Sequence, residues 1–283
     1  MAVSWHEELD STNDECRRQA ERGAPDGTVV AAIRQTAGRG QHGRNWSSLA
    51  GNLHVSFLLR PAPSPARAPE IGFAAALAVA ETVEHFLPPA VPARLKWPND
   101  VLVADGKIAG ILLERSAGAD GGSWLVLGIG INLAAAPPDV AYPARALAEF
   151  VPAPRPAEAL AVLEPSLRGW LARREREGFL PLADAWQARG PSRGERLSVR
   201  MGDRLLAGAF AGLGPAGELL LATPEGTERV IAGEVLAAAP AEREPQQPDP
   251  PFRPPLPKEI GGPPGPEPTR YGDWQFKGRV TDF

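Results

Sequence analysis

The chain has 283 residues, of which 43% are apolar, so its length suggests about two domains and its composition allows at least one sizeable core. Thirty basic residues against 34 acidic ones leave a formal charge of −4, which argues against a general electrostatic attraction to nucleic acid or to an anionic membrane. Cys16 is the only cysteine, so an intrachain disulfide and a cysteine-based zinc cluster are excluded. A polar N-terminus and the lack of an apolar run of about 18 residues predict a cytoplasmic protein without a transmembrane helix.

Hydrophobic periodicity predicts alternating strands and helices over the first two thirds of the chain. Strands are expected at 5–9, 29–34, 53–59, 95–97, 107–115 and 124–132, and helices at 11–22, 70–86, 156–177 and 180–188. Ser11 is expected to cap the first helix, with Asp14 completing a capping box. Turn signals such as Asp105-Gly106 separate the later strands. The pattern is typical of an α+β fold, a mixed but mostly antiparallel sheet with helices on one side.

The last third of the chain differs in composition and in the length of its predicted elements. Short strands are expected at 196–201, 205–213, 218–222 and 228–231, and they predict a small β-barrel. Between Pro245 and Pro268, 11 of 24 residues are proline, which lacks an N–H donor and fixes φ, so a disordered linker of polyproline type is expected. We therefore expect a body at roughly 1–240, made of a larger domain at 1–190 and a barrel at 191–240, followed by a linker at 241–257 and a tail at 258–283.

A loop rich in glycine and arginine follows the second predicted strand. Gly38, Arg39, Gly40, Gly43 and Arg44 fall within seven residues. Glycines let backbone amides approach an anion closely, and arginines supply forked donors to phosphate or carboxylate oxygens. The spacing matches neither the dinucleotide-binding fingerprint nor the Walker A loop. A flexible basic loop without a ligand is the alternative interpretation.

Two further segments carry candidate chemistry. Asp100 follows a turn and could hold a magnesium ion that bridges phosphates. Lys107 opens an apolar strand, and its compact charge suits a reacting phosphoryl oxygen at the floor of a pocket. At Gly128 and Gly130 a flat ligand could lie on the strand. Asn132, which follows them, could donate a hydrogen bond to a purine edge and accept one from it. The alternatives are a turn-forming aspartate, a solvated lysine and a packed strand.

These residues resemble the biotin–protein ligase family. Five motifs occur in the family's order and spacing over residues 1–236, namely ELDSTN, GRGxxGRxW, KWPNDV, KIAGILLE and GIGINL. The resemblance implies a class II synthetase-like catalytic domain that binds biotin and ATP at 1–190, followed by an SH3-like barrel. It implies an ATP-dependent ligase, without a DNA-binding repressor domain, that forms biotinyl-5′-AMP. Biotin then passes to a lysine of the biotin carboxyl carrier domain of a biotin-dependent carboxylase. No DNA or membrane partner is implied, and a homodimer is compatible.

The resemblance also implies roles for individual residues. Biotin would be bound by Ser11, Thr12, Gln35, Gly38, Arg39, Gly40, Lys107, Gly110 and Ile111. ATP would be bound by Arg44, Trp46, Lys107 and Asn132. Lys107, Arg39 and Asp100 would be the catalytic residues, with Asp100 positioning either Mg²⁺, as its ligand, or the acceptor lysine. The family's loop usually reads GRGRxGR, and Gln41 stands here in place of the second arginine. Because glutamine brings no charge, we expect weaker retention of biotinyl-5′-AMP.

The tail at 258–283 resembles a different family. Its GPEPTRYGDW, KGR and DF segments are similar to the C-terminus of succinate dehydrogenase assembly factor 4. That resemblance implies the flavoprotein subunit of succinate dehydrogenase as a partner. Tyr271, Trp274, Phe276 and Phe283 have no core of their own, which favours a binding motif. The alternatives are an inert tail and a fused or misjoined reading frame.

Two alternative functions stay open at this point. One is a lipoate or octanoate transferase of the same superfamily, although the GRGxxGR and KWPND motifs favour biotin. The other is a non-catalytic succinate dehydrogenase assembly protein that acts through the tail and uses the body as a scaffold. The presence of Lys107, Arg39 and Asp100 argues against an inactive body.

Overall fold

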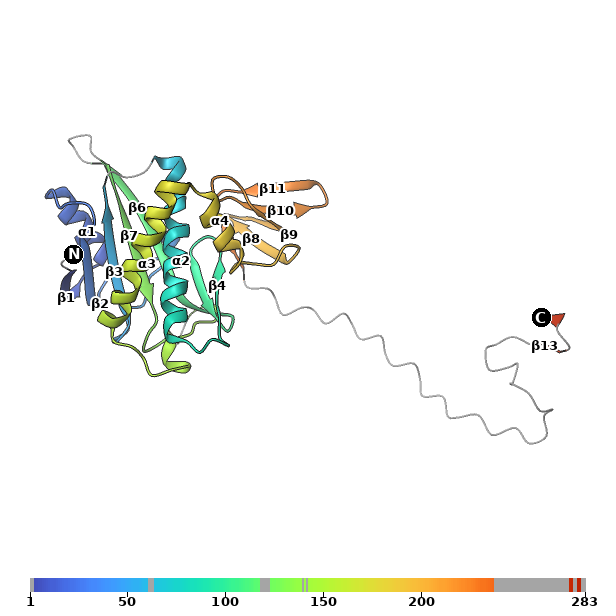
Figure 1. Ribbon diagram of the computed structural model, residues 1–283, viewed down its shortest axis with the longest axis horizontal. Coiled ribbons are helices and arrows are strands. Elements are labelled where there is room, and N and C mark those ends of the chain that lie inside the picture. The colour runs from blue at the N-terminus through green and yellow to red at the C-terminus, as the bar shows by residue number, and fades with distance from the viewer. Residues whose placement is uncertain are drawn as a thin grey trace, which may run out of the picture. The chain divides into compact units, whose positions relative to one another are not determined.

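A computed structural model describes residues 3–60, 64–117, 123–138, 140, 142–236, 275–276 and 279–280 (Figure 1). The chain divides into two compact units, Met1–Ala239 and Pro240–Phe283. None of the helices in the described ranges combines the length and apolar character needed to cross a membrane. The linker predicted at 241–257 lies outside the described residues, as does most of the tail.

The first unit is built on a seven-stranded sheet with the order β1-β2-β3-β7-β6-β5-β4. Its strands are β1 (Val3–Leu9), β2 (Val29–Gln35), β3 (Leu53–Leu59), β4 (Ala93–Lys96), β5 (Asp100–Val103), β6 (Gly106–Ala117) and β7 (Ser123–Ile131). β1 and β2 pair in parallel and every other neighbouring pair is antiparallel. The predicted α+β class with a mixed sheet is confirmed.

Helices cover both faces of this sheet, so the prediction of helices on one side is wrong. α2 (Ala68–Phe86), α3 (Pro156–Glu177) and α4 (Leu180–Gln187) pack on the main core, to which Val29 and Ala31 of β2 contribute. α1 (Thr12–Glu21) lies on the opposite face (Figure 1). There Cys16 packs against Val30. Val29 to Ala32 are all buried, and a strand with two apolar faces needs cover on both.

The hairpin of β5 and β6 differs from the prediction in its first strand, and its loop lies one residue earlier than the predicted Asp105-Gly106 turn. β5 was not predicted, because Pro98-Asn99-Asp100 has the composition of a turn, yet the turn ends at Asn99 and Asp100 opens the strand. The hairpin loop consists of Ala104 and Asp105, with φ of 45° and 61°, as a two-residue type I′ turn requires. The register pairs Asp100 with Lys96 on β4. The hairpin therefore brings Asp100 into the middle of the candidate site.

A five-stranded antiparallel sheet with the order β11-β10-β9-β8-β12 follows in the same unit. Its strands are β8 (Arg196–Met201), β9 (Arg204–Leu213), β10 (Leu219–Thr223), β11 (Gly226–Val230) and β12 (Glu234–Val235). β12 was not predicted. The two sheets share one core, and Trp97 Nε1 donates to the Gly217 carbonyl at 3.0 Å across their junction. In the second unit, β13 (Gln275–Phe276) and β14 (Arg279–Val280) form an antiparallel pair.

Candidate functional site

The face of the large sheet opposite the main core carries a row of small and polar residues. Ile111 and Ile129 point into the main core, so strand alternation turns Gly110, Gly128 and Gly130 to the other face. A Cβ at Gly128 would overlap the Asn13 amide, and a Cβ at Gly130 would overlap the Trp46 ring. The glycines therefore form a flat floor on which side chains from other elements lie directly.

Three adjoining pockets open above this floor. The first is lined by Ser11, Thr12, Asn13, Gln35, Arg39, Gly40, Gln41, Trp46, Asn99, Lys107, Gly110, Ile111, Leu112, Gly128, Ile129 and Gly130. The second is lined by Gly40, Gln41, Arg44, Asn45, Trp46, Lys96, Trp97, Pro98, Asn99, Asp100, Lys107, Tyr142, Gly233 and Glu234. The third is lined by Asn45, Trp46, Ser47, Lys107, Asn132, Pro137, Val140, Tyr142 and Ala144. Trp46 and Lys107 border all three, so they stand where the pockets meet.

The start of α1 forms one wall of the first pocket. Thr12 donates to Gln35 Oε1 from its backbone N–H at 2.8 Å and from its hydroxyl at 3.1 Å. Ser11 precedes the helix, but its side chain makes no capping hydrogen bond. The predicted capping box is therefore wrong, because the Asp14 carboxylate instead accepts hydrogen bonds from Arg17 and Arg39.

The glycine–arginine loop folds back on itself. Trp46 N–H donates to the Gly38 carbonyl at 2.9 Å, and Gly40 N–H donates to the Arg44 carbonyl at 2.7 Å. A Cβ at Gly38 would lie 2.7 Å from the Trp46 carbonyl oxygen, so this close approach requires glycine. Gly38 therefore supports the loop and, unlike Gly40, does not line the first pocket.

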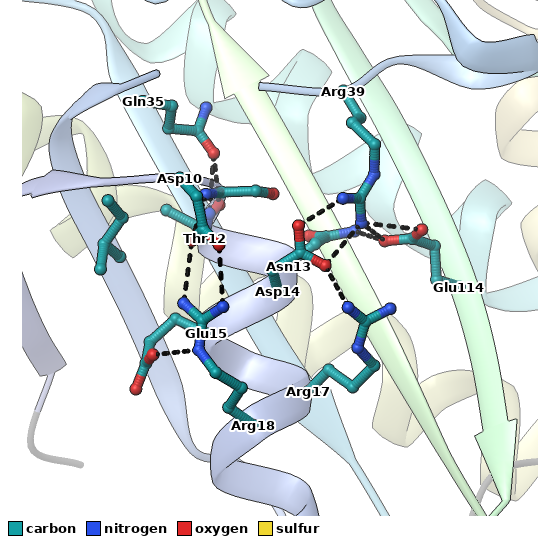
Figure 2. Close-up of polar contacts among 12 residues, drawn as sticks. Asp10, Thr12, Asn13, Asp14, Glu15, Arg17, Arg18, Gln35, Arg39 and Glu114 are labelled. Atoms are coloured by element: carbon teal, nitrogen blue, oxygen red, sulfur yellow. Dashed lines mark hydrogen bonds and ion pairs between the residues drawn. The ribbon is translucent and has the colours of Figure 1, made fainter. Parts of the chain in front are cut away.

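Arg39 is held by two carboxylates from different elements (Figure 2). It pairs with Asp14 on α1 and donates to both oxygens of Glu114 on β6 at 3.1 Å. The hydrogen bond to Asp14, followed by the charge of Glu114, raises the pKa of Arg39 further above its usual range. Arg39 therefore stays charged, and its charge is balanced within the protein.

Lys107 and Asp100 form the corresponding pair between the pockets. Lys107 Nζ lies 2.7 Å from Asp100 Oδ1, and Lys96 Nζ lies 3.9 Å from Asp100 Oδ2. Burial lowers the pKa of Lys96. Within the described ranges no three His, Cys, Asp or Glu side chains gather as a metal site. Asp100 is thus a single carboxylate between two ammonium groups, and its oxygens do not form a metal site by themselves.

The second arginine of the loop contacts the smaller sheet. Arg44 donates to both carboxylate oxygens of Glu234 on β12, one of them at 2.7 Å. The hydrogen bond from Arg44 lowers the pKa of Glu234. Arg39, Arg44 and Lys107 were predicted to meet anions of a ligand, and in this structure each is paired with a carboxylate of the chain itself.

The third pocket contains the predicted purine-reading residue. Asn132 is buried; its Nδ2 donates to the Arg145 carbonyl at 3.1 Å, and Asn52 Nδ2 lies 3.4 Å from its Oδ1. Trp46 Nε1 donates to His54 Nδ1 at 3.2 Å, which fixes the indole over the glycine floor. The Tyr142 ring centroid lies 5.3 Å from Lys107 Nζ. An aromatic wall and a buried amide are the features that bind a flat nitrogenous ring.

Asn13, Ser56, Glu114 and Glu234 are among the residues of this site that sequence reasoning missed, as are Tyr142 and His54. Asn13 and Glu114 stand inside two of the motifs identified from the sequence, ELDSTN and KIAGILLE, and that was the available signal. Ser56 lies in an apolar strand and carries no such signal. Glu234 comes from the smaller sheet, so only the packing of the two sheets brings it to the loop.

Comparisons with known proteins agree with this geometry. The model of the Biotin/lipoate A/B protein ligase family matches residues 5–132. A biotin–[acetyl-CoA-carboxylase] ligase of Paracoccus denitrificans is 38% identical over 80% of this chain and 96% of its own length. The enzyme of that name from Mycobacterium tuberculosis is 35% identical over 80% of this chain and 85% of its own length. The biotin protein ligase of Aquifex aeolicus, solved with biotin and ATP, superposes with a TM-score of 0.71 at 30% identity over 83% of this chain and 97% of its own.

The fold and the pockets thus define an α+β ligase of the biotin and lipoate class. Within that class, the chain belongs to the biotin–protein ligase family. A second family model, described as a protein of unknown function (DUF1674), matches residues 237–283.

Proposed function

We propose that this chain is a biotin–protein ligase, which joins biotin to ATP and then to a lysine of a carrier protein. The observation that carries the proposal is the position of Lys107 and Trp46 at the junction of three pockets. The reaction brings together three groups of different chemistry, namely an apolar bicycle with a polar urea, a triphosphate and a purine. The three pockets offer a matching partner to each.

In the first half-reaction, a carboxylate oxygen of biotin attacks the α-phosphorus of ATP and pyrophosphate leaves, giving biotinyl-5′-AMP. Two anions repel each other, so cations are needed where negative charge develops. Lys107 borders the first and second pockets and can contact both reacting groups. Arg39 serves the first pocket, and Arg44 serves the second beside Lys96. A triphosphate can replace the carboxylates that hold these cations, because it supplies equivalent acceptors at higher charge.

The other predicted residues take roles according to the pocket that they border. Ser11, Thr12 and Gln35 offer hydrogen bonds to the urea of biotin, and the backbone of Gly110 and Ile111 forms part of the floor beneath the bicycle. Gly38 and Gly40 shape the loop that closes over biotin and the phosphates. Trp46 and Asn132 bind the adenine in the third pocket. A closed loop excludes water and protects the mixed anhydride from hydrolysis.

In the second half-reaction, the neutral ε-amine of the acceptor lysine attacks the acyl carbon of biotinyl-5′-AMP. An amide bond forms, the bond from the acyl carbon to the phosphate oxygen breaks, and AMP leaves while the amine loses a proton. We propose a biotin carboxyl carrier domain as the acceptor. Mg²⁺ enters as part of the Mg–ATP substrate, and Asp100 holds the Lys107 ammonium group beside the phosphates that the ion accompanies.

The test is covalent biotin transfer with purified components. The protein is incubated with biotin, Mg–ATP and a carrier domain, and the domain is probed for covalent biotin. Lys107→Ala should abolish transfer, whereas Lys258→Ala, which removes a lysine from the tail, should leave it intact. Replacing biotin by lipoate or octanoate distinguishes the transferase alternative. Transfer that is absent, or equal in the Lys107→Ala variant, would refute the proposal.

We further propose a division into a catalytic domain at 1–190, an SH3-like barrel at 191–240, a linker at 241–257 and a tail at 258–283. The five-stranded sheet β8 to β12 supports the barrel, and the separate compact unit that begins at Pro240 supports a distinct tail. Proteolysis that trims the chain after about residue 240 and leaves a folded, active body would support this division.

For the tail we propose binding to the flavoprotein subunit of succinate dehydrogenase. The support is its resemblance to succinate dehydrogenase assembly factor 4. Deleting the residues after Ala241 should leave biotin transfer intact and abolish retention of the flavoprotein in a pull-down. Equal retention by the full and the shortened chain would contradict this role. The homodimer that the resemblance allows gains no support from the described surfaces, and we do not propose it.

A further inference from the structure

A chain of hydrogen bonds connects the start of α1 with the glycine–arginine loop. Ser56 Oγ on β3 donates to Asn13 Oδ1 at 2.5 Å; Thr12 Oγ1 lies 2.8 Å from Ser56 Oγ with no proton between them, because the Thr12 hydroxyl donates to Gln35. Asn13 Nδ2 donates to Glu114 Oε2 at 2.7 Å, and Arg39 donates to the same carboxylate (Figure 2). Residues on α1, β3, β6 and the loop are thereby joined in one network.

In the buried part of this network, the donor and the acceptor of each hydrogen bond can be assigned. Thr12, Asn13 and Ser56 are all buried, so each of their polar groups needs a partner. The serine hydroxyl has one proton, and it serves the Asn13 carbonyl oxygen. The amide of Asn13 must then present its NH₂ group to Glu114. The absence of a side chain at Gly128 gives Asn13 its place, because a Cβ there would overlap the amide.

Glu114 does not line the first pocket, whereas Arg39 and Asn13 do. Any influence of Glu114 on a ligand in that pocket must therefore pass through one of these two neighbours. The bonds to Asp14 and Glu114 use one Nη1–H and both Nη2–H groups of Arg39. Among the described residues, Nε–H and the second Nη1–H keep no partner. These two bonds point to different sides of the planar guanidinium, and Nε–H lies on the side that faces Glu114, so the second Nη1–H is the donor left for a ligand.

We propose that Glu114 is a positioning residue for Arg39. It holds the guanidinium so that the remaining Nη1–H meets the carboxylate of biotin, and Asn13 ties this position to the start of α1. The inference rests on the proposed function, since biotin is the ligand whose carboxylate Arg39 meets. Because the carboxylates balance the arginine's charge, Arg39 acts through directed hydrogen bonds, and its effect depends on being held in place.

The test compares two ligands that differ only in the carboxylate. Equilibrium binding of biotin and of biotinol, its alcohol analogue, is measured by calorimetry for the full-length protein and the Glu114→Gln variant. Glutamine keeps an acceptor for Asn13 but removes the charge that holds Arg39. Biotin should bind about tenfold more weakly, the loss expected for one charge-assisted hydrogen bond. Biotinol binding should stay unchanged. Equal weakening of both ligands, or of neither, overturns the proposal.

A double-mutant cycle adds an independent criterion. In an Arg39→Ala background, Glu114→Gln should have no further effect on biotin binding, because the route through Arg39 is gone and glutamine keeps the acceptor for Asn13. Effects that multiply would overturn the proposal. Glu177→Gln removes a comparable exposed ion pair with Arg173 at the end of α3 and is the matched control, with binding expected to equal that of the native protein.

A binding control and a substitute variant separate failure of the proposed function from failure of the role proposed for Glu114. If the native protein binds neither biotin nor biotinol, the proposed function fails, rather than the role of Glu114. If Glu114→Gln does not fold, as judged by its thermal transition, Asn13→Ala takes its place, because it removes the N–H that orients Glu114. It should likewise weaken the binding of biotin more than that of biotinol, and equal weakening would overturn the proposal.

Discussion

Lys107 and Asp100, which stand on neighbouring antiparallel strands, form an ion pair with 2.7 Å between Nζ and Oδ1. Both side chains are mostly buried, at 17% and 16% exposure, so solvent screens the pair only partly. In the absence of a ligand, each side chain therefore holds the other in position. Sequence analysis predicted separate roles for them, a lysine for the reacting anions and an aspartate for the metal.

This pair leads to a prediction for Asp100→Asn. Asparagine keeps the size of the side chain but no longer holds the ammonium group, so biotin-dependent exchange of pyrophosphate into ATP should slow about tenfold. The exchange rate is measured against Mg²⁺ concentration at fixed ATP. We expect an unchanged Mg²⁺ midpoint, because Asp100 mainly orients Lys107. A midpoint moved to higher Mg²⁺ would instead make Asp100 a direct metal ligand.

The contact between Gly130 and the Trp46 ring predicts the effect of one added methyl group. Gly130→Ala must displace the indole from the floor of the site, because its Cβ would overlap the ring. Nucleotide and biotin binding should both weaken, and the fluorescence of Trp46 should change. Gly169→Ala is the control: it lies in α3 with no atom within 4 Å of the added Cβ. Alanine is the better helix former there, so this control should bind normally and melt slightly higher.

His54 should make stability depend on pH. Burial lowers the pKa of His54 to about 4, from an unperturbed value of 6.5. Between these values the unfolded chain binds a proton that the folded chain does not, so the free energy of unfolding falls as the pH decreases from 6.5 towards 4. The full loss is on the order of 3 kcal/mol, and the stabilisation is complete above pH 6.5. Protonation would also end the hydrogen bond that Nδ1 accepts from Trp46.

Urea unfolding of the native protein and of His54→Gln at pH 7.5 and pH 5 measures this dependence. The native protein should lose more stability between the two values than the variant does. Carboxylates titrate in both proteins, so their contribution cancels in the difference. An identical pH dependence in the two proteins would show that His54 is not the responsible group.

Gln41 predicts how firmly the intermediate is held. It opens the short 3₁₀ helix Gln41–Gly43 and borders both the first and the second pocket, where a charged side chain would face the phosphate. Gln41→Arg should slow the release of preformed biotinyl-5′-AMP about tenfold, as one charge-assisted hydrogen bond would. Release is followed as free adenylate appearing after gel filtration. The same release rate in both proteins would contradict the expected weak retention.

Local pattern was sufficient for most of the secondary structure. β3 and α3 begin and end at the predicted residues. The signals that predict them are local: the apolar pattern lies within each segment, and the residues that end the segment lie next to it. β5 was missed because its first residue looks like part of a turn, and its pairing partners decide otherwise. The capping box failed for a similar reason: Asp14 has a stronger partner in Arg39, 25 residues away.

The sequence alone determined the class of fold, the loop, the lysine and the floor glycines, because each leaves its mark within a short motif. Only the tertiary structure decided how the charges are distributed. Arg39 meets Glu114 across 75 residues and Arg44 meets Glu234 across 190, through the register of β6 and the packing of the smaller sheet. Ion pairs depend on distances of a few ångströms between elements, and no local pattern of residues encodes such a distance.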